Sequence, residues 1–144
     1  MYLKGIVLEN FKSFGSKVSI PFLPGFTAIT GPNGAGKSNI VDAILFVLGV
    51  RSPKMMRAGK LIDLIYKGDK EAKYCKVSLI FDNSSRAMPI DSDEVVLTRK
   101  IKISPLPDNP LNFYSYFYIN GKSASLNEFV DLLSSANISP NSIV

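Results

Sequence analysis

The sequence predicts an α/β fold in which a mixed, largely antiparallel sheet lies beside one strand–loop–helix unit. Three observations predict it. The chain has 144 residues, enough for one domain with a real core but too few for two. Several stretches combine apolar alternation with the β-branched and aromatic residues of strands. A glycine-rich loop stands between a short apolar stretch and a longer one of helical character.

The first predicted elements are strands. Residues 2–11 and 17–22 predict a hairpin whose turn contains Gly15. A proline-glycine turn then leads into a short buried strand over residues 26–30, which runs directly into the glycine loop. The N-terminal part of the chain therefore carries the strand–loop–helix unit.

The helix after the glycine loop is expected to begin near Gly36 and Lys37 and to end at Gly49, a favourable C-terminal cap. Residues 51–66 are basic first and apolar later, which predicts a loop followed by a short helix or turn. Three further strands are expected, over residues 73–82, 94–103 and 113–119.

A second helix is expected near the end of the chain. Asn120 and Gly121 form a strong tight-turn signal after the last strand. Ser125 and Glu128 have the spacing of a capping box, which starts a helix. The apolar side of this helix consists of Phe129, Val130, Leu132 and Leu133.

Composition excludes several classes of protein. The chain has one cysteine, Cys75, and no histidine, which excludes an internal disulfide, a zinc cluster and histidine acid–base chemistry. Cys75 is expected to be a small core residue. No apolar run approaches the ~20 residues of a membrane span, and the chain does not open on a signal-peptide pattern. We therefore expect a cytoplasmic or nuclear protein without membrane contact.

Positive charge is concentrated in the N-terminal part. The net charge is +5, and residues 1–60 carry eight Lys and Arg against two acidic residues. This excess suits an anionic partner, nucleotide or nucleic acid, although a solvated basic face is the commoner explanation.

The glycine loop is the most informative feature. Gly31, Gly36, Lys37 and Ser38 satisfy G-x-x-x-x-G-K-[ST] in the strand–loop–helix context that this motif requires. Backbone N–H groups around residues 33–38 can point at a phosphate because glycine permits unusual dihedrals, and the helix N-terminus adds its positive end. Lys37 is expected to reach the β- and γ-phosphates and Ser38 to ligate Mg²⁺.

Phosphoanhydride cleavage needs more than this loop. It also requires a metal-holding carboxylate at a strand end and a group that orients the attacking water. Asp82, at the end of an apolar strand, is the obvious candidate. No acid follows it, however, and a strand-end turn with Asn83 and Ser84 is the stronger interpretation.

Four blocks together resemble the N-terminal head lobe of a structural maintenance of chromosomes (SMC) ATPase, and the resemblance covers nearly the whole chain. These blocks are FKSF, GPNGAGKSNIVDAILFVLG, MRAGKLIDLIYKG and IFDNS, over residues 11–14, 31–49, 56–68 and 80–84. The resemblance implies an ABC-type head divided between the two ends of a long chain. The catalytic Glu, the magnesium-supporting Asp and the serine-glycine-glycine signature then belong to a C-terminal lobe. Residues 1–144 are expected to form a single lobe that stops before the coiled coil.

The resemblance assigns roles to individual positions. Lys12 and Ser13 match a segment near the nucleotide, although an ordinary solvated loop is an equal alternative. Arg57 matches a loop arginine that couples DNA to hydrolysis, and Asp63 lies where related heads approach adenine. The phosphate loop of the family matches Asn33, Gly34, Ala35, Gly36, Lys37, Ser38 and Asn39.

DNA contact without sequence preference is a further expectation. It would fall on phosphates and depend steeply on salt. The aromatic residues of 113–119 alternate at strand spacing, where one face is more often core than a base-stacking platform. The candidate cations are Lys4, Lys17, Lys54, Arg57 and Lys60.

The preferred function is Mg-ATP binding in a chromosome condensation and segregation ATPase, where ATP joins two heads and hydrolysis releases them. The implied partners are a C-terminal head lobe, a second SMC head, a kleisin-type subunit and DNA, and the implied location is the chromosome, in the nucleoid or nucleus. The isolated chain is expected to bind ATP but to hydrolyse little or none. Three alternatives remain open: a repair or recombination ATPase head, a self-contained small NTPase or kinase that uses Asp82, and a regulatory lobe.

Overall fold

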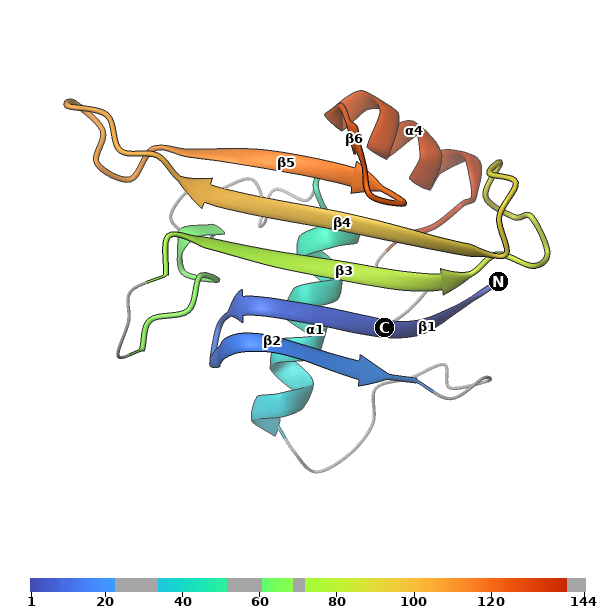
Figure 1. Ribbon diagram of the computed structural model, residues 1–144, viewed down its shortest axis with the longest axis horizontal. Coiled ribbons are helices and arrows are strands. Elements are labelled where there is room, and N and C mark those ends of the chain that lie inside the picture. Colours follow the sequence, from blue (N-terminus) through green and yellow to red (C-terminus); the bar gives the residue numbers. More distant parts are fainter. Residues whose placement is uncertain (23–33, 52–60, 69–71, 140–144) are drawn as a thin grey trace.

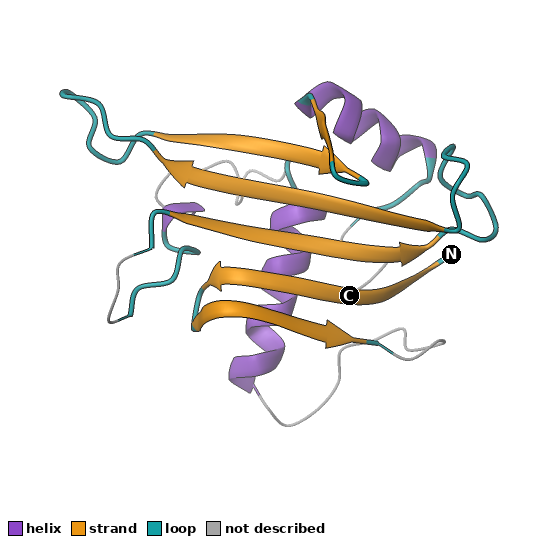
Figure 2. Cartoon of the chain, viewed as in Figure 1, coloured by secondary structure: helices purple, strands orange, loops and turns teal. Residues whose placement is uncertain are grey.

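A computed structural model of the chain describes residues 1–22, 34–51, 61–68 and 72–139. Within these residues one antiparallel sheet carries two helices on the same face, and the opposite face is open (Figures 1 and 2). The sheet has six strands in the order β2-β1-β3-β4-β5-β6. Their bounds are β1 Tyr2–Phe11, β2 Phe14–Pro21, β3 Tyr74–Asp82, β4 Glu94–Ile103, β5 Phe113–Ile119 and β6 Lys122–Ala124.

The first hairpin is confirmed, but its turn is not where the sequence placed it. Gly15 lies inside β2, and the turn consists of Lys12 and Ser13. Asn10 and Lys12 both have left-handed backbones, with φ of 53° and 51°. The sequence prediction of the turn failed because glycine is the usual residue for a left-handed backbone. Here Asn10, beside the turn, and Lys12, within it, adopt that backbone conformation instead.

The central strands follow the predicted alternation. β4 and β5 have the bounds expected from the sequence, and β3 begins one residue later than expected. One face of these strands is buried against the helices. Its residues are Cys75, Val77, Leu79, Phe81, Val95, Leu97, Arg99, Ile101 and Phe117.

Helix α1, Gly34–Leu48, crosses this buried face (Figure 1). It begins two residues before the predicted start, and Gly49 donates its N–H to the Leu45 carbonyl at 2.8 Å, so the predicted end is confirmed. Its apolar side belongs to the core: Ala43, Ile44, Phe46 and Val47 are fully buried. Packing on the sheet therefore fixes the helix that follows the glycine loop.

The C-terminal elements form a hairpin and a capped helix. Asn120 and Gly121, with φ of 49° and 80°, make the predicted tight turn between β5 and β6, the latter a short strand that the sequence did not predict. The capping box is confirmed: Glu128 N–H donates to Ser125 Oγ, and Ser125 N–H donates to a Glu128 carboxylate oxygen. It starts α4, Leu126–Ser135, which packs on β5 where the Phe129 and Phe117 rings lie 5.0 Å apart.

The predicted strand over residues 26–30 lies outside the described residues. Of the mixed sheet that the sequence predicts, the structure therefore describes the antiparallel part. Between Arg51 and Tyr66, residues 61–62 are helical and residues 63–64 form a turn, in agreement with the expected short helix or turn. Cys75 is buried, as predicted. Among the described residues, no helix is long and apolar enough to cross a membrane.

Candidate functional site

The candidate site is the N-terminal end of α1. Asn33 lies outside the described residues, and so do the side chains at positions 34–37, which include Lys37. Ser38 is the first helix residue with a described side chain, and it is exposed. An exposed hydroxyl near the N-terminal end of a helix is available to a ligand on that side, which fits the role that the motif predicts for Ser38.

The turn between β1 and β2 contacts α1 directly. Lys12 Nζ lies 2.5 Å from Asp42 Oδ2, and Asn39 Nδ2 donates to Ser13 Oγ at 2.9 Å. The FKSF block and the glycine-loop helix, which are more than twenty residues apart in sequence, therefore meet side by side. Lys12 and Ser13 are part of this contact with α1, and their place near a nucleotide stays a prediction.

Arg99 of β4 holds the other end of α1. Its Nη1 donates to the Phe46 carbonyl at 3.0 Å and its Nη2 to Ser115 Oγ at 3.3 Å. The guanidinium stacks on two rings, with its central carbon 4.7 Å from the centre of Phe46 and 5.5 Å from that of Phe117. Burial lowers the pKa of Arg99 to about 10. A cation at a helix C-terminus complements the helix dipole, so Arg99 fixes α1 on the sheet.

Sequence reasoning missed Arg99 although a signal was present. Arg99 has the same strand parity as Val95, Leu97 and Ile101, all of which are buried. A lone arginine on the apolar face of a strand predicts a buried guanidinium with a backbone partner. The partner itself, the carbonyl of Phe46, could not be read from the sequence because it comes from another element.

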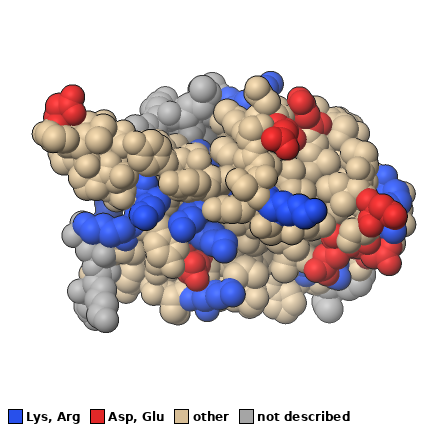
Figure 3. Space-filling model, turned by 45° about the horizontal axis from the view of Figure 1, so that its top comes forward, with Lys and Arg blue, Asp and Glu red and all other residues tan. Residues whose placement is uncertain are grey.

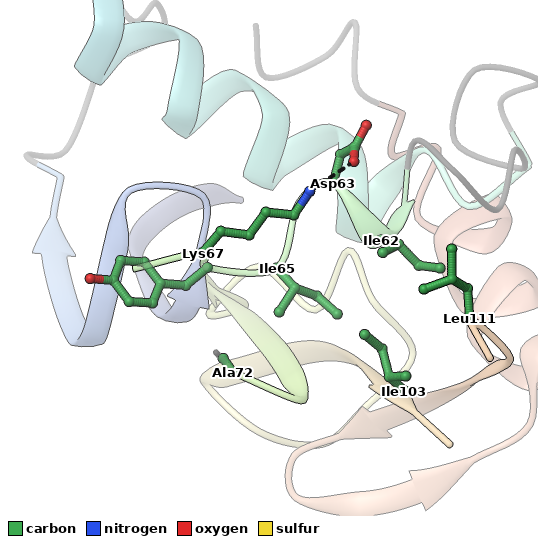
Figure 4. Close-up of a pocket in the computed structure, with 8 residues that line it drawn as sticks. Ile62, Asp63, Ile65, Lys67, Ala72, Ile103 and Leu111 are labelled. Carbon is green, nitrogen blue, oxygen red and sulfur yellow. Dashed lines mark hydrogen bonds and ion pairs between the residues drawn. The ribbon is translucent and has the colours of Figure 1, made fainter. Parts of the chain in front are cut away.

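Among the described residues, Asp63 makes no hydrogen bond or ion pair with α1. It pairs with Lys67 at 3.2 Å, and both side chains are exposed. The two residues line one side of a pocket of about 280 Å³, shown in Figure 4. The pocket is otherwise mainly apolar, with Ile62, Ile65, Tyr66, Ala72, Ile103 and Leu111 on its walls.

Asp82 forms a strand-end turn. Its Oδ1 accepts from the Ser84 hydroxyl at 2.7 Å and from the Ser84 N–H at 3.1 Å, and these hydrogen bonds lower the pKa of Asp82. Asn83, which follows, is fully buried and organises the next loop. Among the described residues, no group of three acidic or thiol side chains is placed to hold a metal ion. The geometry of Asp82 matches the turn interpretation.

The open face of the sheet carries a basic and aromatic surface whose lysines sequence reasoning did not name. Lys76 of β3 lies opposite Lys100 of β4. On the other side of β4, Lys100 lies opposite Tyr116 of β5 and Lys102 lies opposite Tyr114 of β5. Figure 3 shows blue side chains gathered on this side of the molecule. Acidic side chains are interspersed, since Glu9 of β1 lies opposite Lys76. We call Lys76, Lys100, Lys102, Tyr114 and Tyr116 the outer lysine face. Alternation in the β4 sequence was the signal for it, because Lys100 and Lys102 have the opposite parity to the buried set.

The cations proposed from the sequence are not among the five residues of the outer lysine face. Lys4 is bound to Glu94 at 2.7 Å, and this hydrogen bond raises the pKa of Lys4. Lys17 is exposed on the open face, directly opposite Glu9. Lys54, Arg57 and Lys60 lie outside the described residues. The DNA contacts predicted at these three positions stay predictions.

Solved structures define the class of protein. A structure from a study of ATP-driven dimerisation and DNA-stimulated activation of SMC ATPases aligns with a TM-score of 0.79 and 48% identity, over 99% of this chain and 83% of that one. An Smc head with a coiled coil and joint from Pyrococcus yayanosii has the same TM-score at 49% identity, over 99% of this chain and 27% of that one. The fold is thus that of the N-terminal lobe of an SMC ATPase head.

The sequence comparisons agree. Residues 2–143 match the RecF/RecN/SMC N terminal domain, and the chain belongs to this family. It is 49% identical over 144 residues to the chromosome partition protein Smc of Pyrococcus furiosus, a match that covers 97% of this chain and 12% of the relative. It is 53% identical over 115 residues to the Smc protein of Methanococcus voltae, over 78% of this chain and 9% of the relative. The chain thus spans about a tenth of the length of these relatives.

Proposed function

We propose that this chain is the Mg-ATP-binding N-terminal lobe of a chromosome-partition ATPase head. The observation that carries the proposal is the GPNGAGKS motif at the start of α1, a helix that the sheet fixes and that the β1–β2 turn contacts next to the motif. The resemblance to Smc proteins along the whole chain supports the same function.

The residues divide the work of binding by their chemistry. Backbone N–H groups of residues 33–38 would hold the phosphates, and Lys37 would contact the β- and γ-phosphates. The Ser38 hydroxyl would ligate Mg²⁺, which neutralises phosphate charge when bound. Lys12 and Ser13, next to Asn39, would contact the nucleotide from the β1–β2 turn. Arg57 would couple DNA to hydrolysis, and Asp63 would lie on the adenine side.

Hydrolysis would need parts from other chains or lobes. The described residues place Asp82 in a turn with Ser84 and provide no other acidic cluster for the metal. We therefore expect a C-terminal head lobe to supply the catalytic carboxylates and a second head to complete the site. One structural neighbour is an Smc head bound to the C-terminal winged-helix domain of ScpA, which supports a kleisin-type subunit as a further partner.

The experiment is a measurement of Mg-ATP binding and steady-state hydrolysis by this chain, alone and mixed with an SMC C-terminal head lobe. We expect binding without turnover for the chain alone, turnover on mixing, and loss of both with Lys37→Ala. Lys37-dependent turnover by the unmixed chain would instead support the self-contained NTPase that uses Asp82. Absence of Mg-ATP binding would overturn the proposed function.

We also propose that the outer lysine face contacts DNA phosphates without sequence preference. Lys76, Lys100 and Lys102 stand on neighbouring strands, where their ammonium groups can follow a phosphate backbone. Lys100 is further placed by Tyr74, since its Nζ lies 4.9 Å from the ring centre. Chromosome-associated location follows from this role. The curated relatives are chromosome partition proteins, which favours this function over repair or recombination.

The test of DNA contact is affinity for a double-stranded oligonucleotide at several salt concentrations. Lys100→Ala should weaken binding equally for unrelated sequences and reduce the salt slope by about 0.9. The matched control is Lys122→Ala, because Lys122 is exposed and opposite Ile119 on the helix side of the sheet. Equal losses for the two variants, or an unchanged slope for Lys100→Ala, would count against this face.

A further inference from the structure

We propose that Asp42 is a positioning residue for nucleotide binding: it holds the Lys12 ammonium beside the first turns of α1, ready to contact phosphate. The proposal rests on the proposed function, because only a bound nucleotide presents a phosphate to Lys12. The glycine-loop motif ends at Ser38, so it assigns no role to Asp42.

The ion pair is short and partly shielded. Lys12 Nζ lies 2.5 Å from Asp42 Oδ2, with 27% of the lysine side chain and 14% of the aspartate side chain exposed. The other ion pairs among the described residues have side chains at least 40% exposed. Since a shielded pair is less screened by solvent and salt, the Lys12–Asp42 pair holds its geometry better than these.

Asp42 is on the face of α1 that bears the site. It follows Asn39 by three residues and Ser38 by four, and side chains at these spacings lie on one side of a helix. The Asn39 amide already contacts Ser13 of the same β1–β2 turn. The Lys12 ammonium is therefore held on the side of the helix that carries the Ser38 hydroxyl.

The backbone of Lys12 is fixed independently of Asp42. Lys12 N–H donates to the Leu64 carbonyl at 2.7 Å, and Tyr66 N–H donates to the Asn10 carbonyl at 2.8 Å. The Phe11 ring, fully buried, packs 5.8 Å from the Phe46 ring of α1. What stays free is the long lysine side chain, and Asp42 is the group that orders it.

An ordered ammonium favours binding in two ways. Lysine carries three N–H donors, so it can keep the bond to Asp42 while it donates to a phosphate oxygen. A side chain that is already ordered also loses less conformational freedom when the ligand binds. Removal of Asp42 should therefore weaken nucleotide binding although it also removes a negative charge from the neighbourhood.

The experiment measures the dissociation constant of Mg-ATP for variants of this chain. Asp42→Ala should weaken binding roughly two- to tenfold, the range expected for ordering one long side chain. Asp42→Asn, which keeps an acceptor oxygen, should fall between wild type and Asp42→Ala. The double variant Lys12→Ala with Asp42→Ala should bind like Lys12→Ala alone, because Asp42 acts through Lys12. The matched control is Glu94→Ala, which frees Lys4 from a 2.7 Å ion pair near the opposite end of β1 and should leave binding unchanged.

A readout without nucleotide separates positioning from general stability. Chemical acetylation of Lys12 should be slow in the wild type and faster in Asp42→Ala. The acetylation rate of Lys122 should be the same in both proteins, and the melting temperature of Asp42→Ala should stay within a few degrees of the wild-type value. If the wild type binds Mg-ATP in a Lys37-dependent way but Asp42→Ala binds as well or better, the inference is wrong and the proposed function stands. If the wild type does not bind, both are overturned.

Discussion

Single buried polar side chains determine local geometry at several points of this lobe. Asn83 is the clearest case: it is fully buried, its Nδ2 lies within hydrogen-bonding distance of the Met88, Ile90 and Ser92 carbonyls, and its Oδ1 accepts from the Met88 N–H. One amide side chain thus organises the loop between β3 and β4. Its removal would leave several buried backbone groups without partners.

At the residue scale we expect Asn83→Ala to lower the free energy of unfolding by about 2–4 kcal/mol, since each unsatisfied buried group costs about 1–3 kcal/mol. Chemical denaturation monitored by circular dichroism measures this. Ser85→Ala, an exposed change in the same loop, is the control and should stay within about 0.5 kcal/mol. A loss below about 1 kcal/mol for Asn83→Ala would contradict the anchoring role.

The buried thiol gives a second residue-scale prediction. Burial raises the pKa of Cys75 from 9.0 to about 12. Because the folded-state pKa is raised, the associated stability is fully present below pH 9 and declines as the pH rises toward 12. At pH 8 a disulfide reagent should label Cys75 only slowly in the folded chain and rapidly in guanidinium chloride. Fast labelling under native conditions would show that the thiol is accessible.

At the scale of elements, the two helices are held in different ways. α4 begins with its own capping box, a local device within the sequence. α1 is held by other elements, through Asp42 and Asn39 to the β1–β2 turn and through the Phe46 carbonyl to Arg99. The placement of α1 therefore depends on tertiary contacts.

The capping box predicts a measurable loss. Ser125→Ala removes the hydroxyl that accepts from the Glu128 N–H and should lower the free energy of unfolding by about 0.5–2 kcal/mol. Thermal or urea unfolding checks this. Ser134→Ala, in the last turn of α4, is the matched control and should have almost no effect, because alanine is the better helix former. Equal effects of the two changes would rule out a specific role for the cap.

At the scale of the whole molecule, charge and packing are divided between the two faces of the sheet. The helices and the core lie on one face, and the outer lysine face lies on the other. The chain spans about a tenth of the length of its curated relatives, and we propose that a C-terminal lobe completes the head.

If that proposal is correct, an SMC C-terminal head lobe should stabilise the chain by mass action. At a concentration 100 times its dissociation constant it adds about 2.7 kcal/mol, which corresponds to a rise in melting temperature of roughly 5–15 °C. Differential scanning calorimetry over a range of concentrations measures the rise, with an unrelated protein at equal concentration as control. A melting temperature that does not depend on the added lobe would contradict the composite head.

The sequence by itself determined the strands of the central sheet, the tight turn at Asn120 and the start of α4, because these follow from alternation and from contacts within a few residues. It also determined the glycine-loop motif and, through the four blocks, the family. Only the tertiary structure decided that Lys12 meets Asp42, that Arg99 holds Phe46, and that Lys76 and Lys100 share one open face. These contacts join elements that are far apart in the chain. The elements meet because the strands pair and α1 packs on the sheet, and no local sequence pattern specifies this arrangement.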